Sequence, residues 1–285
     1  MIKLRNGVMM PKLGLGTFRI MDRNECVKVI QHALEVGYRH IDTAQMYQNE
    51  ACIGEAIASS KFDRKDIFIT SKQRHHMPLD DAKSAFEETL ANLQTDYVDL
   101  FLIHWPNHDK EINQETWCFF ESLYEQKKAR AIGISNFQRH HIMDLYETAR
   151  VKPFVNQVEL HPGLPQLSLK RYLDSEGIMT TSYGPLMKGG VFEGHYGETL
   201  GEIARKYDAT IAQVVIAWGL ARNVIMIPKS ATLKRIEENF QAKDLVLDSQ
   251  DIMRINELSR GERVYTDPDN SPWGIYKSYK PEKSV

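Results

Sequence analysis

The feature that most constrains the fold is a regular alternation between short apolar runs and longer amphipathic stretches. Eight apolar runs of strand length occur, at residues 12–18, 38–42, 66–72, 97–105, 129–136, 154–160, 179–184 and 224–229. Apolar residues recur with helical spacing at residues 25–37, 50–60, 79–93, 114–126, 138–150, 167–177, 199–207, 212–222 and 233–241. Continuous apolar runs are typical of buried parallel strands, so this order predicts a chain of strand–helix units.

Two α/β architectures accommodate such a chain: a (β/α)8 TIM barrel and a doubly wound nucleotide-binding sheet. The second requires the pattern GxGxxG after its first strand. Here Gly14 and Gly16 are followed by Arg19 where the third glycine belongs, so we predict the barrel. No Pro/Gly-rich linker divides the chain. We therefore expect one domain, residues 1–285, with an N-terminal β-hairpin and a C-terminal loop or tail over the barrel mouth.

Composition and charge argue against several classes of partner. The net charge of the 285-residue chain is −2, which gives no electrostatic reason to bind nucleic acid or an anionic membrane surface. The N-terminus lacks the apolar core of a signal peptide, and the longest apolar runs are too short to span a bilayer. We expect a cytoplasmic monomer that acts on a small molecule, without nucleic-acid or membrane partners.

Three cysteines occur, Cys26, Cys52 and Cys118, without a CxxC pair or a metal-ligand spacing. Disulfides are rare in cytosolic proteins, so the sequence predicts three reduced thiols.

Polar residues end most of the predicted strands, which an apolar strand does not require. In chain order these residues are Thr17, Asp42, Lys72, His104, Ser135, Asn136, Glu159, Tyr183, Lys229 and Ser230. Each has an ordinary structural interpretation when taken alone, such as a helix cap, a core tyrosine or a solvated charge. Active sites of (β/α)8 barrels lie at the carboxyl ends of the strands, so the succession predicts a functional site there.

Four of the candidate residues form a coherent acid–base group: Asp42, Tyr47, Lys72 and His104. A tyrosine has a pKa near 10, which makes it a poor proton donor at neutral pH. A lysine ammonium about 4 Å away, at an effective dielectric of about 20, favours the phenolate by roughly 4 kcal/mol. We therefore expect Lys72 to lower the pKa of Tyr47, with Asp42 as counter-ion and His104 orienting a substrate oxygen.

The same segments resemble the aldo-keto reductase family along nearly the whole chain. The resemblance is carried by GLGTF, HIDTAQMYQNE, the SK that ends at Lys72, LFLIHWP, IGISNF, NQVELHP, SYGPL and IPKSATLKRIEEN. It implies an NADPH-dependent reductase of aldehydes or ketones, in which Tyr47 is the general acid. The substrates would include dicarbonyls and polar or anionic carbonyl compounds. The resemblance also implies further cofactor-binding residues. These are Thr17 at the first strand end, Ser135, Asn136 and Gln157 at the nicotinamide carboxamide, Tyr183 against its ring, and Glu238 and Asn239 at the adenine.

The IPKS stretch has physical meaning on its own. A helix that begins just after Lys229 and Ser230 presents free backbone N–H groups and a positive dipole end. Arg235 lies six residues beyond Lys229 and adds a second cation. This combination suits a ribose 2′-phosphate and so favours NADPH over NADH.

The predicted substrate pocket departs from the family's usual pattern. Many members carry an aliphatic residue and then tryptophan after the lysine, whereas Gln73, Arg74, His75 and His76 follow here. We expect a more polar wall that includes Arg74, beside aromatic walls from Phe18 and Trp105. The segment 262–285 lacks periodicity and is rich in turn formers. The resemblance makes its Trp273 and Tyr276 candidates for substrate contact.

Two other functional classes remain open at this stage. A metal-dependent hydrolase could use His40, Asp42, His104 and His161, although such sites typically need a His-x-His that is absent here. A nucleotide-binding sensor or partner subunit could keep the fold without relevant turnover. The reductase interpretation is preferred, and it requires no metal ion.

Overall fold

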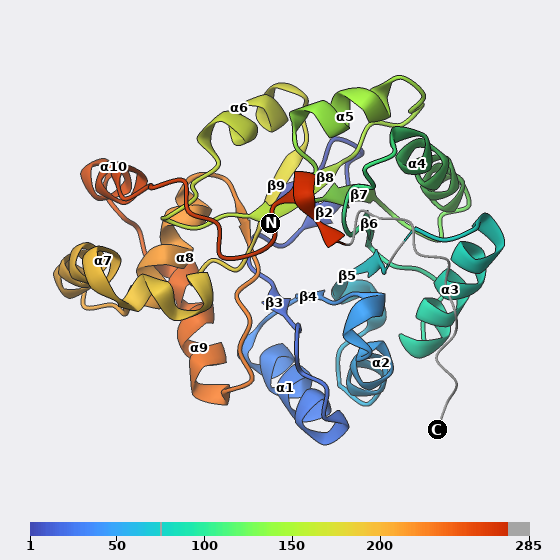
Figure 1. The fold of residues 1–285 in the computed structure, drawn as a ribbon. Helices are drawn as coiled ribbons and strands as arrows, with labels where there is room; N and C mark the ends of the chain where they lie inside the picture. The colour runs from blue at the N-terminus through green and yellow to red at the C-terminus, as the bar shows by residue number, and fades with distance from the viewer. Residues whose placement is uncertain (75, 273–285) are drawn as a thin grey trace.

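The computed structural model describes residues 1–74 and 76–272, and its centre is a barrel of parallel strands (Figure 1). Neighbouring strands in the sheet follow the order of the chain. They are β3 (Leu15–Gly16), β4 (His40–Asp42), β5 (Phe68–Gln73), β6 (Leu100–Ile103), β7 (Ile132–Ser135), β8 (Val155–Glu159), β9 (Met179–Tyr183) and β10 (Ile225–Met226). Parallel bridges from Leu13 to Met226 and from Gly16 to Lys229 join the first strand to the last. The prediction of a (β/α)8 barrel is confirmed.

Closure of the barrel explains why residue 16 is a glycine. A Cβ on Gly16 would stand 2.9 Å from the carbonyl oxygen of Ile227, closer than the chain allows. The same glycine donates its backbone N–H to the carbonyl of Pro228 at 3.1 Å. A side chain at this position would therefore push apart the two edge strands that close the barrel.

The helices form a ring around the strands (Figure 1). They are α1 (Arg23–Val36), α2 (Glu50–Ala58), α3 (Leu79–Asn92), α4 (Lys110–Glu125), α5 (Arg139–Tyr146), α6 (Leu167–Ser175), α7 (Gly194–Lys206), α8 (Ile211–Ala221), α9 (Leu233–Gln241) and α10 (Ser249–Glu257). Short 3-10 turns are η1 (Gln45–Tyr47), η2 (Arg64–Asp66), η3 (Met187–Phe192), η4 (Ala242–Asp244) and η5 (Pro268–Asn270). The sequence prediction missed α10, although Asp248 is a recognisable N-cap that accepts from the backbone N–H of Asp251.

The expected N-terminal hairpin is present and lies at the amino end of the barrel. It pairs β1 (Ile2–Lys3) with β2 (Met9–Met10) in antiparallel register. The Arg5 guanidinium donates to the carbonyl oxygens of Lys152 and Glu176, which precede β8 and β9. Because amino ends of parallel strands share one face, the hairpin covers the face opposite the predicted site.

The C-terminal segment crosses the other face as far as it is described. We call residues 262–266 the strap. Val264, Tyr265 and Thr266 contribute to the wall of the cavity at the carboxyl end of the barrel. The prediction that Trp273 and Tyr276 contact substrate lies outside the described residues, as does His75.

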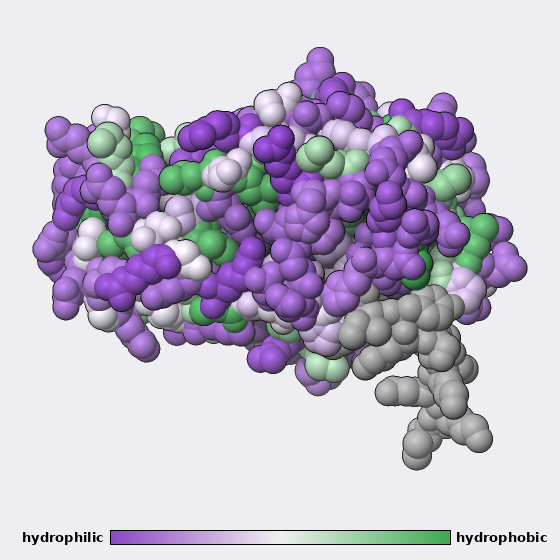
Figure 2. Space-filling model, turned by 45° about the horizontal axis from the view of Figure 1, so that its top comes forward, coloured by the Kyte–Doolittle hydropathy of each residue, from purple (hydrophilic) through white to green (hydrophobic). Residues whose placement is uncertain are grey.

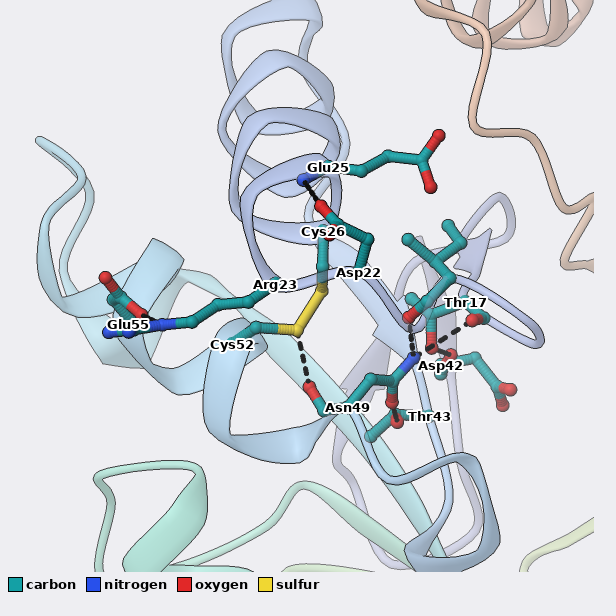
Figure 3. Close-up of a disulfide and its surroundings, with 11 residues drawn as sticks. Thr17, Asp22, Arg23, Glu25, Cys26, Asp42, Thr43, Asn49, Cys52 and Glu55 are labelled. Atoms are coloured by element: carbon teal, nitrogen blue, oxygen red, sulfur yellow. Dashed lines mark hydrogen bonds and ion pairs between the residues drawn. A yellow bond between two sulfur atoms is a disulfide. The ribbon is translucent and has the colours of Figure 1, made fainter.

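The prediction of three reduced thiols is wrong. Cys26 on α1 and Cys52 on α2 form a disulfide, and Cys118 is a free, exposed thiol (Figure 3). The cysteines are 26 residues apart in sequence, and their Cα atoms are 6.1 Å apart. Packing of α1 against α2 brings the two thiols together, which no local pattern in the sequence could show.

The disulfide lies beside a buried amide that organises the barrel mouth. Asn49, just before α2, donates from Nδ2 to the carbonyls of Thr17 at 3.0 Å and Ile20 at 3.1 Å (Figure 3). Its Oδ1 accepts from the Thr43 hydroxyl at 2.6 Å. Asn49 therefore connects the loop after β3 to the loop after β4, both of which border the cavity.

Candidate active site

The carboxyl ends of the strands surround a cavity of about 840 Å³. Residues that the sequence singled out contribute much of its wall: Thr17, Phe18, Asp42, Tyr47, His104, Trp105, Ser135, Asn136, Gln157, Tyr183, Lys229 and Arg235. The prediction of a site at this end of the barrel is therefore supported by the convergence of side chains from seven strands and the segments that follow them.

A buried ion pair lies at the base of the cavity. Lys72 Nζ on β5 is 2.6 Å from Asp42 Oδ1 on β4 and donates to the Thr43 carbonyl at 2.8 Å. Lys72 is 0% exposed. Asp42 Oδ2 accepts from Gln157 Nε2 at 2.7 Å, so both carboxylate oxygens have partners.

Burial and mutual attraction act in opposite senses on this pair. Burial raises the pKa of Asp42, and attraction to Lys72 opposes that rise. Burial likewise lowers the pKa of Lys72, and the Asp42 carboxylate opposes the fall. Direct contact at 2.6 Å and the extra bonds from Gln157 and Thr43 are the conditions under which a buried pair stays ionised.

Tyr47 stands above the ion pair on η1, the turn after β4. Its ring packs 5.1 Å from the ring of Phe18 and 5.8 Å, edge to face, from that of His104. Lys72 Nζ is 5.0 Å from the centroid of the Tyr47 ring. The side chains of Lys72 and His104 are thus both adjacent to the Tyr47 ring, as proton transfer requires.

The expected lowering of the Tyr47 pKa is wrong in direction. Burial raises this pKa well above its usual value, and the negative charge of Asp42 adds to the rise. The physical reason is that Asp42 neutralises the nearby ammonium of Lys72, so Tyr47 experiences a neutral pair and little water. The phenol is consequently protonated at neutral pH.

Four further residues form a polar wall beside Tyr47. Tyr183 donates its hydroxyl to Asn136 Oδ1 at 2.8 Å, and Asn136 Nδ2 donates to the His104 carbonyl at 2.9 Å. The Ser135 hydroxyl donates to the Gln157 carbonyl at 2.8 Å. This set offers hydroxyl and amide groups next to an aromatic face. Such chemistry suits a planar ring that carries a carboxamide, so the residues fit the nicotinamide end of NADPH.

Asn136 adopts φ of 67°, a left-handed conformation that asparagine tolerates better than most residues. This backbone geometry places its side chain between the ends of β6 and β9, where it contacts His104 and Tyr183.

Another part of the cavity wall is cationic. Lys229 follows β10 and Arg235 lies on α9, and both line the cavity with exposed side chains. The Ser230 hydroxyl accepts from the backbone N–H of Thr232 at 3.1 Å and so shapes the turn into α9. Ser230, Glu238 and Asn239 do not line the cavity, although all belong to this segment. The two cations fit a 2′-phosphate.

The residues proposed for substrate contact divide into two groups. Phe18 and Trp105 line the cavity, whereas Arg74 does not. The backbone N–H of Arg74 donates to Gln45 Oε1 at 3.0 Å, which ties its backbone to η1. Trp273 lies outside the described residues.

Sequence reasoning missed several residues of the wall. Arg19, Lys188 and Tyr265 line the cavity, and none of them ends a predicted strand. In the sequence, Arg19 stands out only as the residue that breaks a glycine pattern. Lys188 and Tyr265 come from segments without periodicity, so no local signal marked them.

Glu50, the first residue of α2, is a buried carboxylate. Its oxygens accept from the Ser71 hydroxyl at 2.5 Å and the Thr89 hydroxyl at 3.2 Å. Burial raises the pKa of Glu50 to about 6, and these two hydrogen bonds oppose the rise.

The metal-hydrolase alternative finds no support in the described residues. His40 pairs with the Thr70 hydroxyl at 3.0 Å, and His161 pairs with Glu159 at 2.9 Å. Across residues 1–74 and 76–272, the group that could hold a metal ion is His140, His141 and Asp269, none of which lines the cavity. Nor does any helix in this part of the chain combine the length and apolar character needed to cross a bilayer.

Known proteins resemble this chain over nearly its full length. Residues 12–260 match the model of the aldo/keto reductase family. Glyoxal reductase of Bacillus subtilis is 43% identical, in an alignment that covers 94% of this chain and 96% of the reductase. Methylglyoxal reductase DkgA of Escherichia coli K12 is 40% identical, in an alignment that covers 94% of this chain and 96% of DkgA.

Solved structures agree with these relatives. An aldo-keto reductase from a Medee basin deep-sea metagenome library superposes with a TM-score of 0.89 at 39% identity, covering 95% of this chain and 99% of that one. A Gox0644 variant in complex with NADPH superposes with a TM-score of 0.87 at 34% identity, covering 95% and 97%. The chain belongs to the aldo-keto reductase family and is an NADPH-dependent oxidoreductase.

Proposed function

We propose that this protein reduces small aldehydes, ketones and dicarbonyls to alcohols at the cavity where Tyr47 and His104 face one another. The observation that carries the proposal is the position of these two rings. They meet edge to face beside the buried Asp42–Lys72 pair, in a cavity that Lys229 and Arg235 also line. A carbonyl oxygen between the two rings would have a phenol and an imidazole within reach.

Tyr47 is the proton donor in this proposal. The phenol is protonated at neutral pH, which is the form that a general acid needs, but the burial that raises its pKa also makes the proton harder to release. Giving up the proton leaves a phenolate, and the nearby ammonium of Lys72 stabilises that negative charge. The Lys72 ammonium therefore stabilises the transition state, in which Tyr47 becomes negative, more than the resting state, as catalysis requires.

Asp42 and Gln157 hold the lysine in place for this role. Asp42 accepts from Lys72 through one oxygen and from Gln157 through the other, which fixes the carboxylate between two strands. The ammonium is thereby held in the protein interior, with its charge compensated until the phenolate forms. His104, near the Tyr47 ring, orients the carbonyl oxygen.

Bound NADPH supplies the hydride. Ser135, Asn136 and Gln157 would hold its carboxamide, with Tyr183 against the ring. Lys229, Ser230 and Arg235 would hold the 2′-phosphate end, with Glu238 and Asn239 near the adenine. Thr17 donates its hydroxyl to the Asp42 carbonyl at 2.9 Å and so supports the wall between these two ends.

The proposed substrates are small and uncharged, with glyoxal and methylglyoxal as the first choices. Relatives that are 43% and 40% identical bear the names glyoxal reductase and methylglyoxal reductase. Phe18 and Trp105 give the cavity aromatic walls, and Arg74 is not among the residues that line it.

A panel of glyoxal, methylglyoxal, benzaldehyde and a 2-keto acid, each assayed by NADPH consumption, tests the proposal. Tyr47→Phe keeps the ring and removes the proton, so it should abolish most turnover while leaving NADPH affinity nearly unchanged. Tyr172→Phe on α6, outside the cavity, is the matched control. Binding of NADPH without turnover of any carbonyl would favour a nucleotide-binding sensor instead.

We also propose that the chain acts as a single domain and a monomer. Hydrophilic residues cover most of the face drawn in Figure 2, and hydrophobic residues there are confined to smaller patches. Stable homodimers typically bury larger apolar areas. Sedimentation velocity at two protein concentrations tests the monomer, and a concentration-dependent dimer peak would contradict it.

A further inference from the structure

Another cavity lies away from the barrel mouth, between α5 and α6, which are neighbours in the ring of helices (Figure 1). Its volume is about 730 Å³, and among the described residues it shares no wall residue with the cavity that holds Tyr47. The wall is formed by the start of α5, by residues 164–169, by one face of α6 and by Ser259, which follows α10. The carbonyl chemistry proposed above makes no use of this space.

The wall of this cavity is positively charged. Arg139 is the first residue of α5, Arg171 lies in the middle of α6, and the described wall contains no aspartate or glutamate. Neither guanidinium has an ion-pair or hydrogen-bond partner within the described part of the chain. Asp174, one turn beyond Arg171, is already paired with Lys170 at 2.8 Å. Two cations therefore border a cavity in which the protein supplies no counter-ion.

The Arg139 side chain reaches across from α5 to α6. Its guanidinium carbon lies 5.2 Å from the centroid of the Tyr172 ring, which also belongs to the wall. A guanidinium that stacks on an aromatic ring is held by its face, and its N–H groups point outward from its edge. The contact thus positions the Arg139 guanidinium beside the cavity and leaves its N–H donors available to a ligand.

A third arginine adds positive charge behind the wall. Arg222, which follows α8, donates from one terminal nitrogen to the carbonyl oxygen of Pro165 at 2.7 Å, and Pro165 lines the cavity. Its other terminal nitrogen is buried and has no hydrogen-bond partner among the described residues. Burial lowers the pKa of Arg222 to about 10, against the opposing charge of Asp174, so the guanidinium stays charged at neutral pH. An anion in the cavity would compensate this partly buried charge.

The start of α6 supplies backbone donors at the same wall. Gln166 occupies the N-cap position, but its side chain caps no N–H group of α6 and donates instead to the Glu159 carbonyl at 3.0 Å. The first N–H groups of a helix have no partner within the helix, and they carry the positive end of its dipole. Residues 166–169 line the cavity, so these donors lie at its wall. Gln138 Nε2, at the start of α5, is a further buried donor without a partner among the described residues.

We propose that this cavity is a binding site for a small phosphate monoester, held between Arg139, Arg171 and the start of α6. Guanidinium groups and helix N-termini are the donors that proteins commonly use to bind phosphate. A volume of about 730 Å³ is larger than inorganic phosphate requires and lies in the range of small-molecule sites, so it leaves room for the organic part of the ester. The site is separate from the one at which carbonyl compounds are reduced.

Calorimetric titration of single-site variants tests the assignment. Each protein is titrated with inorganic phosphate, glycerol 3-phosphate and citrate, the last of which carries its charge on carboxylates. Arg139→Gln and Arg171→Gln each remove one guanidinium from the cavity. Arg235→Ala removes a cation from the cavity at the barrel mouth and so controls for binding there. Arg205→Gln controls for net charge, because this exposed arginine lies in the last turn of α7, at the negative end of the helix dipole.

We expect Arg139→Gln and Arg171→Gln each to weaken glycerol 3-phosphate by about tenfold, the effect of one charge-assisted hydrogen bond. Arg235→Ala and Arg205→Gln should bind it as tightly as the wild type does. The assignment is overturned if the wild type shows no saturable binding, if the double variant Arg139→Gln, Arg171→Gln binds normally, or if Arg235→Ala loses binding. Tighter binding of citrate than of glycerol 3-phosphate would contradict the choice of phosphate as the recognised group.

Thermal unfolding provides an independent measurement and checks that the variants fold. Arg139 and Arg171 are exposed, so without ligand the double variant should unfold near the temperature of the wild type. A ligand that binds the folded state raises the Tm. Glycerol 3-phosphate should therefore raise the Tm of the wild type and of Arg235→Ala, and it should leave that of the double variant unchanged. An equal rise in all three proteins would place the anion elsewhere and refute the proposal.

Discussion

Loss of the Cys26–Cys52 crosslink should destabilise the protein by an amount that follows from its position in the chain. The disulfide closes a loop of 26 residues between α1 and α2. Loop-closure entropy for that length is roughly 12 cal/mol/K, which corresponds to about 3.5 kcal/mol at 25 °C. The unfolding entropy of a 285-residue chain is about 0.6 kcal/mol/K, so the Tm should fall by about 6 °C on reduction.

The measurement compares oxidised and reduced protein by thermal unfolding, after counting thiols in denaturant. Oxidised protein should show one reactive thiol, from Cys118, and fully reduced protein three. Both bridged cysteines are buried, at 0% and 6% exposure, so reduction must be carried to completion before the scan. The double variant Cys26→Ser, Cys52→Ser should unfold near the temperature of reduced wild type and be insensitive to reductant.

Cys118→Ser is the matched control because it removes the exposed thiol and keeps the crosslink. Its Tm and its response to reductant should equal those of the wild type. Three thiols in protein purified without reductant, or a Tm that reductant leaves unchanged, would refute the reasoning. Turnover below the transition should persist after reduction, because the three side-chain bonds of Asn49 to the loops around the cavity involve no sulfur.

Three further substitutions test the site. Lys72→Met leaves Asp42 buried without its counter-ion, so denaturant unfolding should show a free energy of unfolding lower by about 3–5 kcal/mol. The pH–rate profile of this variant should flatten, and an unchanged profile with only a higher KM would contradict the catalytic role. Arg235→Ala should weaken NADPH by about tenfold in fluorescence titration and leave NADH little changed, whereas parallel losses would point to the adenosine half. The carboxyl of Glu50 has its pKa raised to about 6, so the folded state holds this proton more tightly than the unfolded state, and stability falls as pH rises from about 4.5 to 6. Glu50→Gln should therefore gain about 2 kcal/mol of unfolding free energy relative to wild type between about pH 4.5 and pH 7, and a pH-independent difference would refute this.

The sequence by itself determined the barrel and which polar residues gather at its mouth. Strand and helix periodicities are local, and parallel strands must bring their carboxyl ends to one face. Asp42, Lys72 and His104 could therefore be assigned to one site from their places at strand ends. Tyr47 followed as the residue five positions beyond Asp42. Lys229 and Arg235 were found in the same way, because a helix start is a local signal for an anion.

Only the tertiary structure decided the features that depend on distances between remote segments. The Cys26–Cys52 bond needs α1 packed against α2, and the contact of Lys188 with the strap joins residues 76 positions apart. The direction of the Tyr47 pKa shift was mispredicted for the same reason. A charge acts through its separation, its counter-ion and the water around it, and all three are set by packing. Burial of Tyr47 and neutralisation of Lys72 by Asp42 outweigh the attraction that residue identity alone suggested.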